Sequence, residues 1–129
     1  MDTPHNLYQL LAKIAFLTAD CQALPIAEKI FQSIHKAKPE HQTPIVGLAY
    51  TALLASKFDE AVTLLRDKVL AANPNNPTAK AYLGLALGCK GDVEASNTIL
   101  EQVLKEAKDT SAAKFAELVP QFLKAIKGT

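Results

Sequence analysis

The residues of this chain that could act as metal ligands or nucleophiles are few and widely separated. Its three histidines are His5, His35 and His41, and its two cysteines are Cys21 and Cys89. A zinc site needs ligands a few residues apart, for example at i and i+4 on one helix face, and none of these residues has a second ligand placed in that way. We therefore expect no metal centre and no cofactor, and we expect both thiols to be reduced.

The acidic residues and the glycines offer no better catalytic candidates. Glu28, Asp59 and Glu60 fall on predicted helix surfaces or caps, without a neighbour that would make one carboxyl an acid and the other a base. The glycines of segment 84–91 follow no predicted strand, whereas a phosphate-binding loop does. We expect that the protein is not an enzyme.

Composition limits the partners as well. The 129 residues include 14 basic and 13 acidic side chains spread along the chain, so that the net charge is +1. This balance argues against nucleic acid and anionic membrane surfaces, and weak self-repulsion favours protein association. No apolar run approaches ~18 residues, and the first residues lack the basic region of a signal peptide. We expect a cytoplasmic, soluble protein that does not insert into membranes.

Helix signals punctuate the chain at short intervals. Thr-Pro or Asn-Pro pairs at 3–4, 43–44 and 76–77 each combine an N-cap side chain with a proline suited to the first helical turn. Asp59 and Asp92 are further candidate N-caps. We predict helices over residues 5–19, 24–37, 43–56, 59–72, 77–90, 93–107 and 111–127, and short connections favour antiparallel packing of successive helices.

An internal repeat runs through these helices. A shift of 35 residues aligns Leu48-Ala49 with Leu83-Gly84 and Pro39 with Pro74, and a shift of 34 aligns Ile14-Ala15 with Leu48-Ala49 and Phe31 with Leu65. A fixed period of this length indicates stacked helix pairs.

The repeated residues resemble the tetratricopeptide repeat, most clearly in KFDEAVTLL at 57–65 and NPNNPTAKAYLGLALGCKGD at 73–92. The resemblance implies an all-α protein, an α-solenoid formed as one domain over residues 1–129. Its parts would be helix pairs at about 8–41, 42–76 and 77–110, followed by a capping helix over 111–127. The first pair departs from the pattern at Thr18 and Pro25, and Lys80 replaces a large apolar residue in the third.

In the repeats that this chain resembles, the first helix of each pair lines a concave groove. The corresponding positions here are mainly apolar, and Lys13 is the single basic residue among them, which argues against a clamp for a terminal carboxylate. Gly88 would leave free space in the groove floor. The residues expected to anchor a partner are Phe16, Val46, Tyr50, Leu53, Tyr82, Leu85 and Cys89.

The length, the helix number and the groove also resemble the small cytoplasmic chaperones of bacterial type III secretion, which hold a helix of the needle subunit. We therefore expect a chaperone that binds an amphipathic helix of a partner protein. The alternative is a structural adaptor or self-associating scaffold whose apolar face is a subunit contact. Two further points stay open. The first is that the groove residues could pack between repeats or against the last helix. The second concerns Pro120, which should bend or break that helix: the bend could shape a groove or have no functional role.

Overall fold

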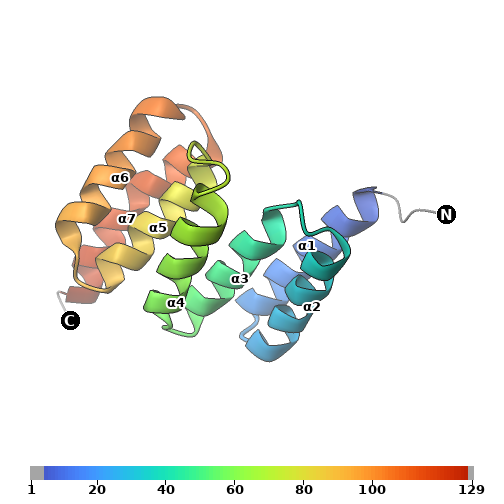
Figure 1. Ribbon diagram of the computed structural model, residues 1–129. Helices are drawn as coiled ribbons and strands as arrows, with labels where there is room; N and C mark the ends of the chain where they lie inside the picture. The colour runs from blue at the N-terminus through green and yellow to red at the C-terminus, as the bar shows by residue number, and fades with distance from the viewer. Residues whose placement is uncertain (1–4, 128–129) are drawn as a thin grey trace. The chain divides into compact units, whose positions relative to one another are not determined.

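All the regular structure of the described residues is helical. The computed structural model describes residues 5–127, and side chains over 7–125. Figure 1 shows the helices in chain order. Their bounds are α1 His5–Asp20, α2 Leu24–Ala37, α3 Thr43–Leu54, α4 Phe58–Thr63, the π-helix η1 Leu64–Leu70, α5 Pro77–Cys89, α6 Val93–Glu106 and α7 Ser111–Lys127. Because η1 continues α4 without a break, residues 5–127 form seven helices, as predicted. The all-α class is confirmed.

The chain divides into two compact units, with the division between Lys57 and Phe58. The first unit contains α1, α2 and α3, and the second contains α4, η1, α5, α6 and α7. Within each unit, helices that follow one another in sequence pack against each other, which is consistent with an array of helix pairs. The prediction that residues 1–129 form one domain stays a prediction.

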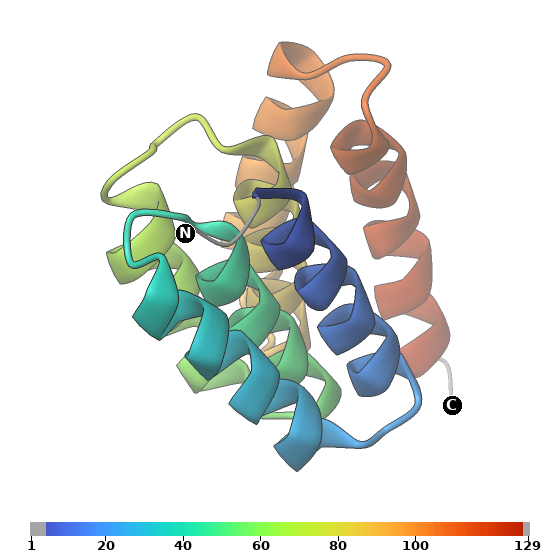
Figure 2. The ribbon, with the colours of Figure 1, turned by 90° about the vertical axis from the view of Figure 1, so that its right-hand side faces the viewer.

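The core of the first unit forms where small residues let helices approach closely. Ala15, Ala19 and Ala27 are fully buried around the ring of Phe31, and α3 packs on both preceding helices (Figure 2). Gly47 of α3 lies directly against that ring, because a methyl group at Gly47 would come within 2.1 Å of the Phe31 Cε1 atom. The glycine is needed here for space and not for backbone conformation.

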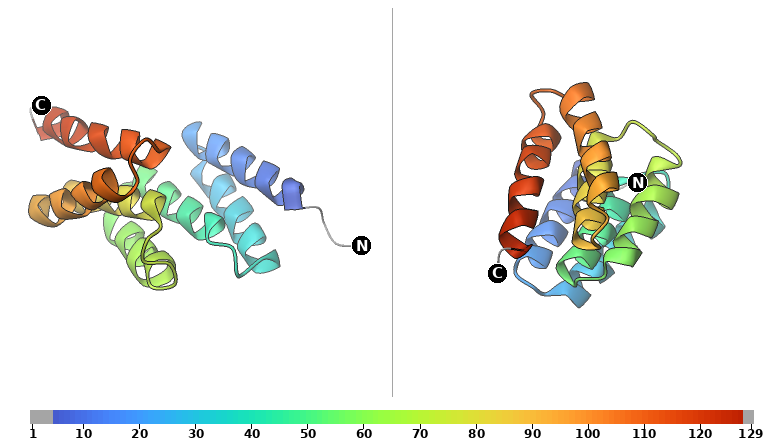
Figure 3. Two further views of the ribbon diagram at one scale, coloured as in Figure 1. Left: turned by 90° about the horizontal axis from the view of Figure 1, so that it is seen from above. Right: turned by 90° about the vertical axis from the view of Figure 1, so that its left-hand side faces the viewer.

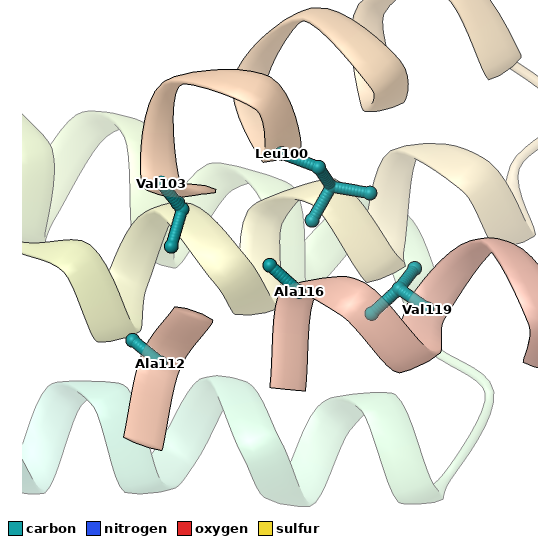
Figure 4. Close-up of a cluster of buried hydrophobic side chains, with 5 residues drawn as sticks. All are labelled: Leu100, Val103, Ala112, Ala116 and Val119. Atoms are coloured by element: carbon teal, nitrogen blue, oxygen red, sulfur yellow. The ribbon is translucent and has the colours of Figure 1, made fainter. Parts of the chain in front are cut away.

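The second unit has α5 at its centre, in contact with α4, η1, α6 and α7. Helices α6 and α7 also pack on each other, as the left view of Figure 3 shows. A cluster of buried side chains joins them, drawn in Figure 4. Its members are Leu100, Val103, Ala112, Ala116 and Val119. Three of the five come from α7, so the last helix is an integral part of this core.

Three of the helix starts are capped by side chains. Asn76, Asp92 and Thr110 each accept a hydrogen bond from the backbone N–H three residues further along, at 3.1, 3.3 and 3.1 Å. These bonds satisfy donors that would otherwise have no partner at the first turn. The predicted starts at Asn76 and Asp92 and over 109–111 are confirmed.

Two other predicted caps are wrong. Helix α3 begins at Thr43 itself, and Gln42 occupies the cap position without a side-chain bond. Helix α4 begins one residue before Asp59, so Asp59 lies in the first turn. Its carboxylate there receives a 2.6 Å ion pair from Lys90, and a negative charge suits the positive end of the helix dipole. The predicted cap at 3–4 lies outside the described residues.

The π-helix η1 explains why the repeat period changes from 34 to 35. Pro39 follows Phe31 by eight positions, whereas Pro74 follows Leu65 by nine. The buried residues that the repeat aligns are spaced by four and then three positions in α2 and α6, but by four and four in α4 and η1, where Val62 is buried as well. The three sets are 27, 31 and 34; 96, 100 and 103; and 61, 65 and 69. The wider π turns keep Val69 buried despite one additional residue.

Helix α7 is continuous from Ser111 to Lys127 although Pro120 lies inside it. A proline removes one backbone hydrogen bond, and its ring crowds the carbonyl four residues earlier, so it kinks or breaks many helices. Here Pro120 is exposed, whereas Val119 beside it is buried. The predicted break at Pro120 is therefore not observed.

Candidate functional site

Four of the seven predicted anchors lie in the first unit, and they differ in exposure. Phe16 and Tyr50 are half-buried, and their ring centroids lie 5.5 Å apart between α1 and α3. Phe16 also meets Phe31 edge to face at 4.9 Å. Val46 and Leu53 are only 6% and 9% exposed, so they offer a partner little surface. The partly accessible surface of this set is therefore aromatic.

The Tyr50 hydroxyl donates a hydrogen bond to the carboxylate of Asp20, at the last residue of α1. Because Phe16 contacts the same ring, Tyr50 is held on two sides. An amphipathic ring that is fixed in this way can contact an apolar partner while its polar end stays hydrogen-bonded. Sequence reasoning placed Tyr50 in the groove, but it did not foresee this bond.

The other three predicted anchors lie on α5 in the second unit, and all three are half-buried. The ring of Tyr82 meets that of Phe115 on α7, edge to face at 5.3 Å. Leu85 packs against the cluster that joins α6 and α7. Part of the surface of these anchors is therefore taken by the last helix.

The free space expected beside Gly88 is not there. A methyl group at Gly88 would lie 2.2 Å from the Leu123 Cδ1 atom, so the α7 side chain already occupies this position. Gly88 lets α7 approach α5 closely and leaves no room for a side chain of a partner protein. The prediction of a vacant floor at Gly88 is wrong, because a small residue on a helix face admits any neighbour, including one from the same chain.

Burial also sets the chemistry of the two cysteines. Burial raises the pKa of the Cys89 thiol above its ordinary value, so this thiol stays protonated at neutral pH. Cys21 is exposed near the end of α1. No group of three or more His, Cys, Asp or Glu side chains within the described part of the chain could hold a metal ion.

A partly buried ion pair replaces an apolar contact at Lys80. The Lys80 side chain is 9% exposed, and its Nζ atom lies 3.0 Å from the Glu106 Oε2 atom on α6. The departure from the repeat pattern at this position is therefore balanced by a carboxylate from the paired helix. A shallow depression of about 390 Å³ adjoins the pair and is lined by Asn75, Pro77, Lys80, Val103, Glu106 and Ala107.

Four exposed aliphatic residues on α1 were missed by sequence reasoning. Leu7, Leu10, Ile14 and Leu17 on α1 are 41%, 53%, 42% and 64% exposed, and we call these four residues the α1 stripe. On α7, Leu118 and Phe122 are 60% and 51% exposed. The signal in the sequence was the 3-4-3 spacing of the four aliphatic residues, which groove mapping passed over in favour of positions such as Phe16.

Comparisons with known proteins do not assign the chain to a family. No protein-family model matches it, and neither does any curated protein. Within the described residues, no helix has both the length and the apolar character needed to cross a membrane. The class defined by the structure is therefore an all-helical protein whose helices pack in sequential pairs.

Proposed function

We propose that the chain is a protein-binding module, an α-solenoid of tetratricopeptide-like helix pairs that sequesters an amphipathic helix of a partner protein. In this proposal it acts as a cytoplasmic chaperone, and the needle subunit of a type III secretion system is the kind of partner that fits. The observation that carries the proposal is the pair of partly exposed aromatic contacts, Phe16 with Tyr50 and Tyr82 with Phe115.

Each of these contacts joins the first helices of two consecutive pairs, α1 with α3 and α5 with α7. In each unit, the helices expected to line a binding surface therefore present a half-buried ring, and such rings are common anchors in protein interfaces. The Tyr50 hydroxyl is already bonded to Asp20, so burial of this ring would leave no polar group without a partner.

The near-neutral charge supports a partner that is held mainly by apolar contacts. An amphipathic helix is the element that presents apolar side chains at i, i+3 and i+4 to such a surface. Covering exposed apolar side chains would also protect both proteins from aggregation, which is the task of a chaperone of this kind.

The test compares capture by wild-type protein, Tyr50→Ala and Tyr82→Ala. A protein enriched from the host lysate by the wild type is identified, and a peptide of its amphipathic helix is titrated by fluorescence anisotropy. We expect each variant to weaken peptide binding by roughly tenfold or more while helical circular dichroism is unchanged. Tyr50→Phe is the matched control, since it keeps the ring and removes only the bond to Asp20. Equal binding by both alanine variants would rule out these rings as anchors.

The exposed α1 stripe favours a second candidate, a structural adaptor or self-associating scaffold whose apolar face is a subunit contact. Sedimentation velocity of the purified protein separates the candidates. A chaperone without its partner would be a poorly soluble monomer that co-expression with the partner rescues, whereas a scaffold would be a stable homo-oligomer on its own.

A further inference from the structure

The α1 stripe occupies a face that the repeat buries elsewhere. Shifts of 34 and then 35 residues carry Leu10, Ile14 and Leu17 onto positions 79, 83 and 86 of α5. Those positions hold Ala79, Leu83 and Ala86, which are at most 5% exposed. The stripe on α1 is therefore the uncovered equivalent of a helix-packing surface.

The second unit shows what covers this face on α5. Gly84 faces Leu100 of α6, and Gly88, one turn further along the same side of α5, faces Leu123 of α7. Helices α4 and η1 also pack on α5, and Leu83 is buried among these helices of the second unit. Both α4 and η1 precede α5 in sequence and run antiparallel to it. In the first unit α1 packs on α2 and α3, and the α1 stripe is left exposed.

The spacing of the stripe also selects a helix. Leu7, Leu10, Ile14, Leu17 and the exposed Cys21 follow one another at intervals of three, four, three and four. This is the a and d pattern of a seam between two helices, with Ile14 at a and Leu17 at d. A seam of this length, carrying about half-exposed aliphatic side chains, fits a small interface of moderate affinity.

We propose that the occupant is α1 of a second copy of this chain, packed antiparallel across a two-fold axis. Lys13 and Asp20 flank the seam on one edge, both at g positions, and both are exposed. In an antiparallel pair that sets Ile14 opposite Leu17 of the second copy, g faces g, so Lys13 lies opposite Asp20 of the second copy and the reverse. Two-fold symmetry makes two ion pairs from one complementary pair of residues.

Other arrangements of the same seam lose this match. An antiparallel pair shifted by one heptad, with Leu10 opposite Ile14, brings Lys13 against Lys13 of the second copy. A parallel pair sets Lys13 against Thr18. Within the described residues Lys13 takes part in no other ion pair, and Asp20 accepts only the neutral hydroxyl of Tyr50. The charges therefore select the antiparallel arrangement and leave it free to form.

The four stripe residues are not among the anchors of the proposed helix-binding function, and Asp20 is the residue that the two proposals share, because it accepts the hydrogen bond of the Tyr50 hydroxyl. Leu10→Asp therefore tests the dimer apart from helix binding, whereas Asp20→Lys acts on both. The decisive experiment mixes two charge variants, Lys13→Asp and Asp20→Lys. Each variant alone would set like charges opposite each other at both ends of the seam. Mixed at equal concentrations, they would set opposite charges together at both ends. Only an interface between copies in this register predicts that two defective variants restore one another.

Sedimentation equilibrium over a series of concentrations measures the result. We expect the wild type to dimerise, each charge variant alone to dissociate roughly tenfold more readily, and the mixture to recover the wild-type affinity. Leu10→Asp should abolish the dimer, and Leu118→Asp, an exposed leucine on α7, is the control that should leave it unchanged. Thermal melts confirm that each variant is folded.

A second measurement fixes the orientation. In the proposed register Leu10 lies opposite Cys21 of the second copy, so Leu10→Cys should form an oxidised dimer linked between residues 10 and 21, mapped by mass spectrometry. A monomeric wild type at all concentrations, a Leu10→Asp dimer as stable as the wild type, or a mixture that fails to recover would each overturn the proposal. A wild type that is monomeric alone, yet loses a partner protein on Leu10→Asp, would assign the stripe to that partner and not to a second copy.

Discussion

The Ser96 hydroxyl donates a 2.6 Å hydrogen bond to the backbone carbonyl oxygen of Gly84, across the contact between α6 and α5. Ser96 is fully buried, and a methyl group at Gly84 would lie 2.6 Å from the Leu100 Cδ2 atom. The small residue and the polar residue of this contact therefore depend on each other. Only a close approach of the two helices brings the hydroxyl within reach, and only glycine allows that approach.

Substitutions at this contact should lower the free energy of unfolding. Gly84→Ala forces the buried Leu100 side chain to move, at about 1–3 kcal/mol, which exceeds the gain of up to about 1 kcal/mol in helix propensity. Ser96→Ala removes the bond and should lower stability by about 1 kcal/mol. Urea unfolding measures both. Thr98→Ala, which removes an exposed hydroxyl bond on the same helix, should change stability by less than about 0.5 kcal/mol. If Thr98→Ala lowered stability as much as Ser96→Ala, burial would not explain the effect at Ser96.

Replacing one partner of the Lys80–Glu106 pair should act differently from replacing the other. Glu106→Gln leaves the Lys80 ammonium buried without a counter-charge, and we expect a loss of about 1–3 kcal/mol because Glu106 itself is half-exposed. Lys80→Met removes the buried charge and restores an apolar contact, so it should be neutral or stabilising. Chemical unfolding of both single variants and the double variant measures the coupling. If Glu106→Gln is as stable as the wild type, water already solvates the Lys80 ammonium and the ion pair is not needed for stability.

Deletion of Asp67 should be tolerated. Asp67 is exposed within η1, and its removal would restore the four-and-three spacing of buried residues that α2 and α6 have. We expect helical content to be kept and the free energy of unfolding to change by no more than about 1 kcal/mol. Deletion of Gln102 in α6 is the matched control, because it rotates the buried Val103 out of the core. That control should lose at least about 2 kcal/mol in the same thermal melts. Equal losses in the two deletions would refute the extra-residue account of η1.

Alkylation should distinguish the two thiols. Burial raises the Cys89 pKa, and the thiolate is the reactive form, so iodoacetamide at neutral pH should modify exposed Cys21 at least about tenfold faster. The Cys89 rate should rise with pH and approach that of Cys21 in urea, where burial is lost. Peptide mass spectrometry at several pH values measures both rates.

The raised pKa of Cys89 also has a consequence for stability. Its contribution is present below the ordinary value of 9.0 and is lost as pH rises through the higher folded value.

Local sequence signals predicted the helices because their causes are local. Caps such as Asn76 and Asp92 bond to donors three residues away, and prolines at first turns already have the required φ angle. The repeat register also aligned Gly84 with Ala49, another small residue. The same register could not distinguish a small residue that allows close helix packing from one that leaves open space. Gly88 resembles an open site in sequence, and Leu123, which fills it, is thirty-five residues further along.

The sequence by itself determined the number of helices within residues 5–127 and their limits to within about two residues. Exposure was decided by the tertiary structure. Ile14 and Leu83 hold the same position in the repeat, yet Ile14 is 42% exposed and Leu83 is 5% exposed. Periodicity shows that a helix has an apolar face, but burial depends on a second element that covers that face. On α5 the chain supplies that element, and on α1 we infer that a second copy does.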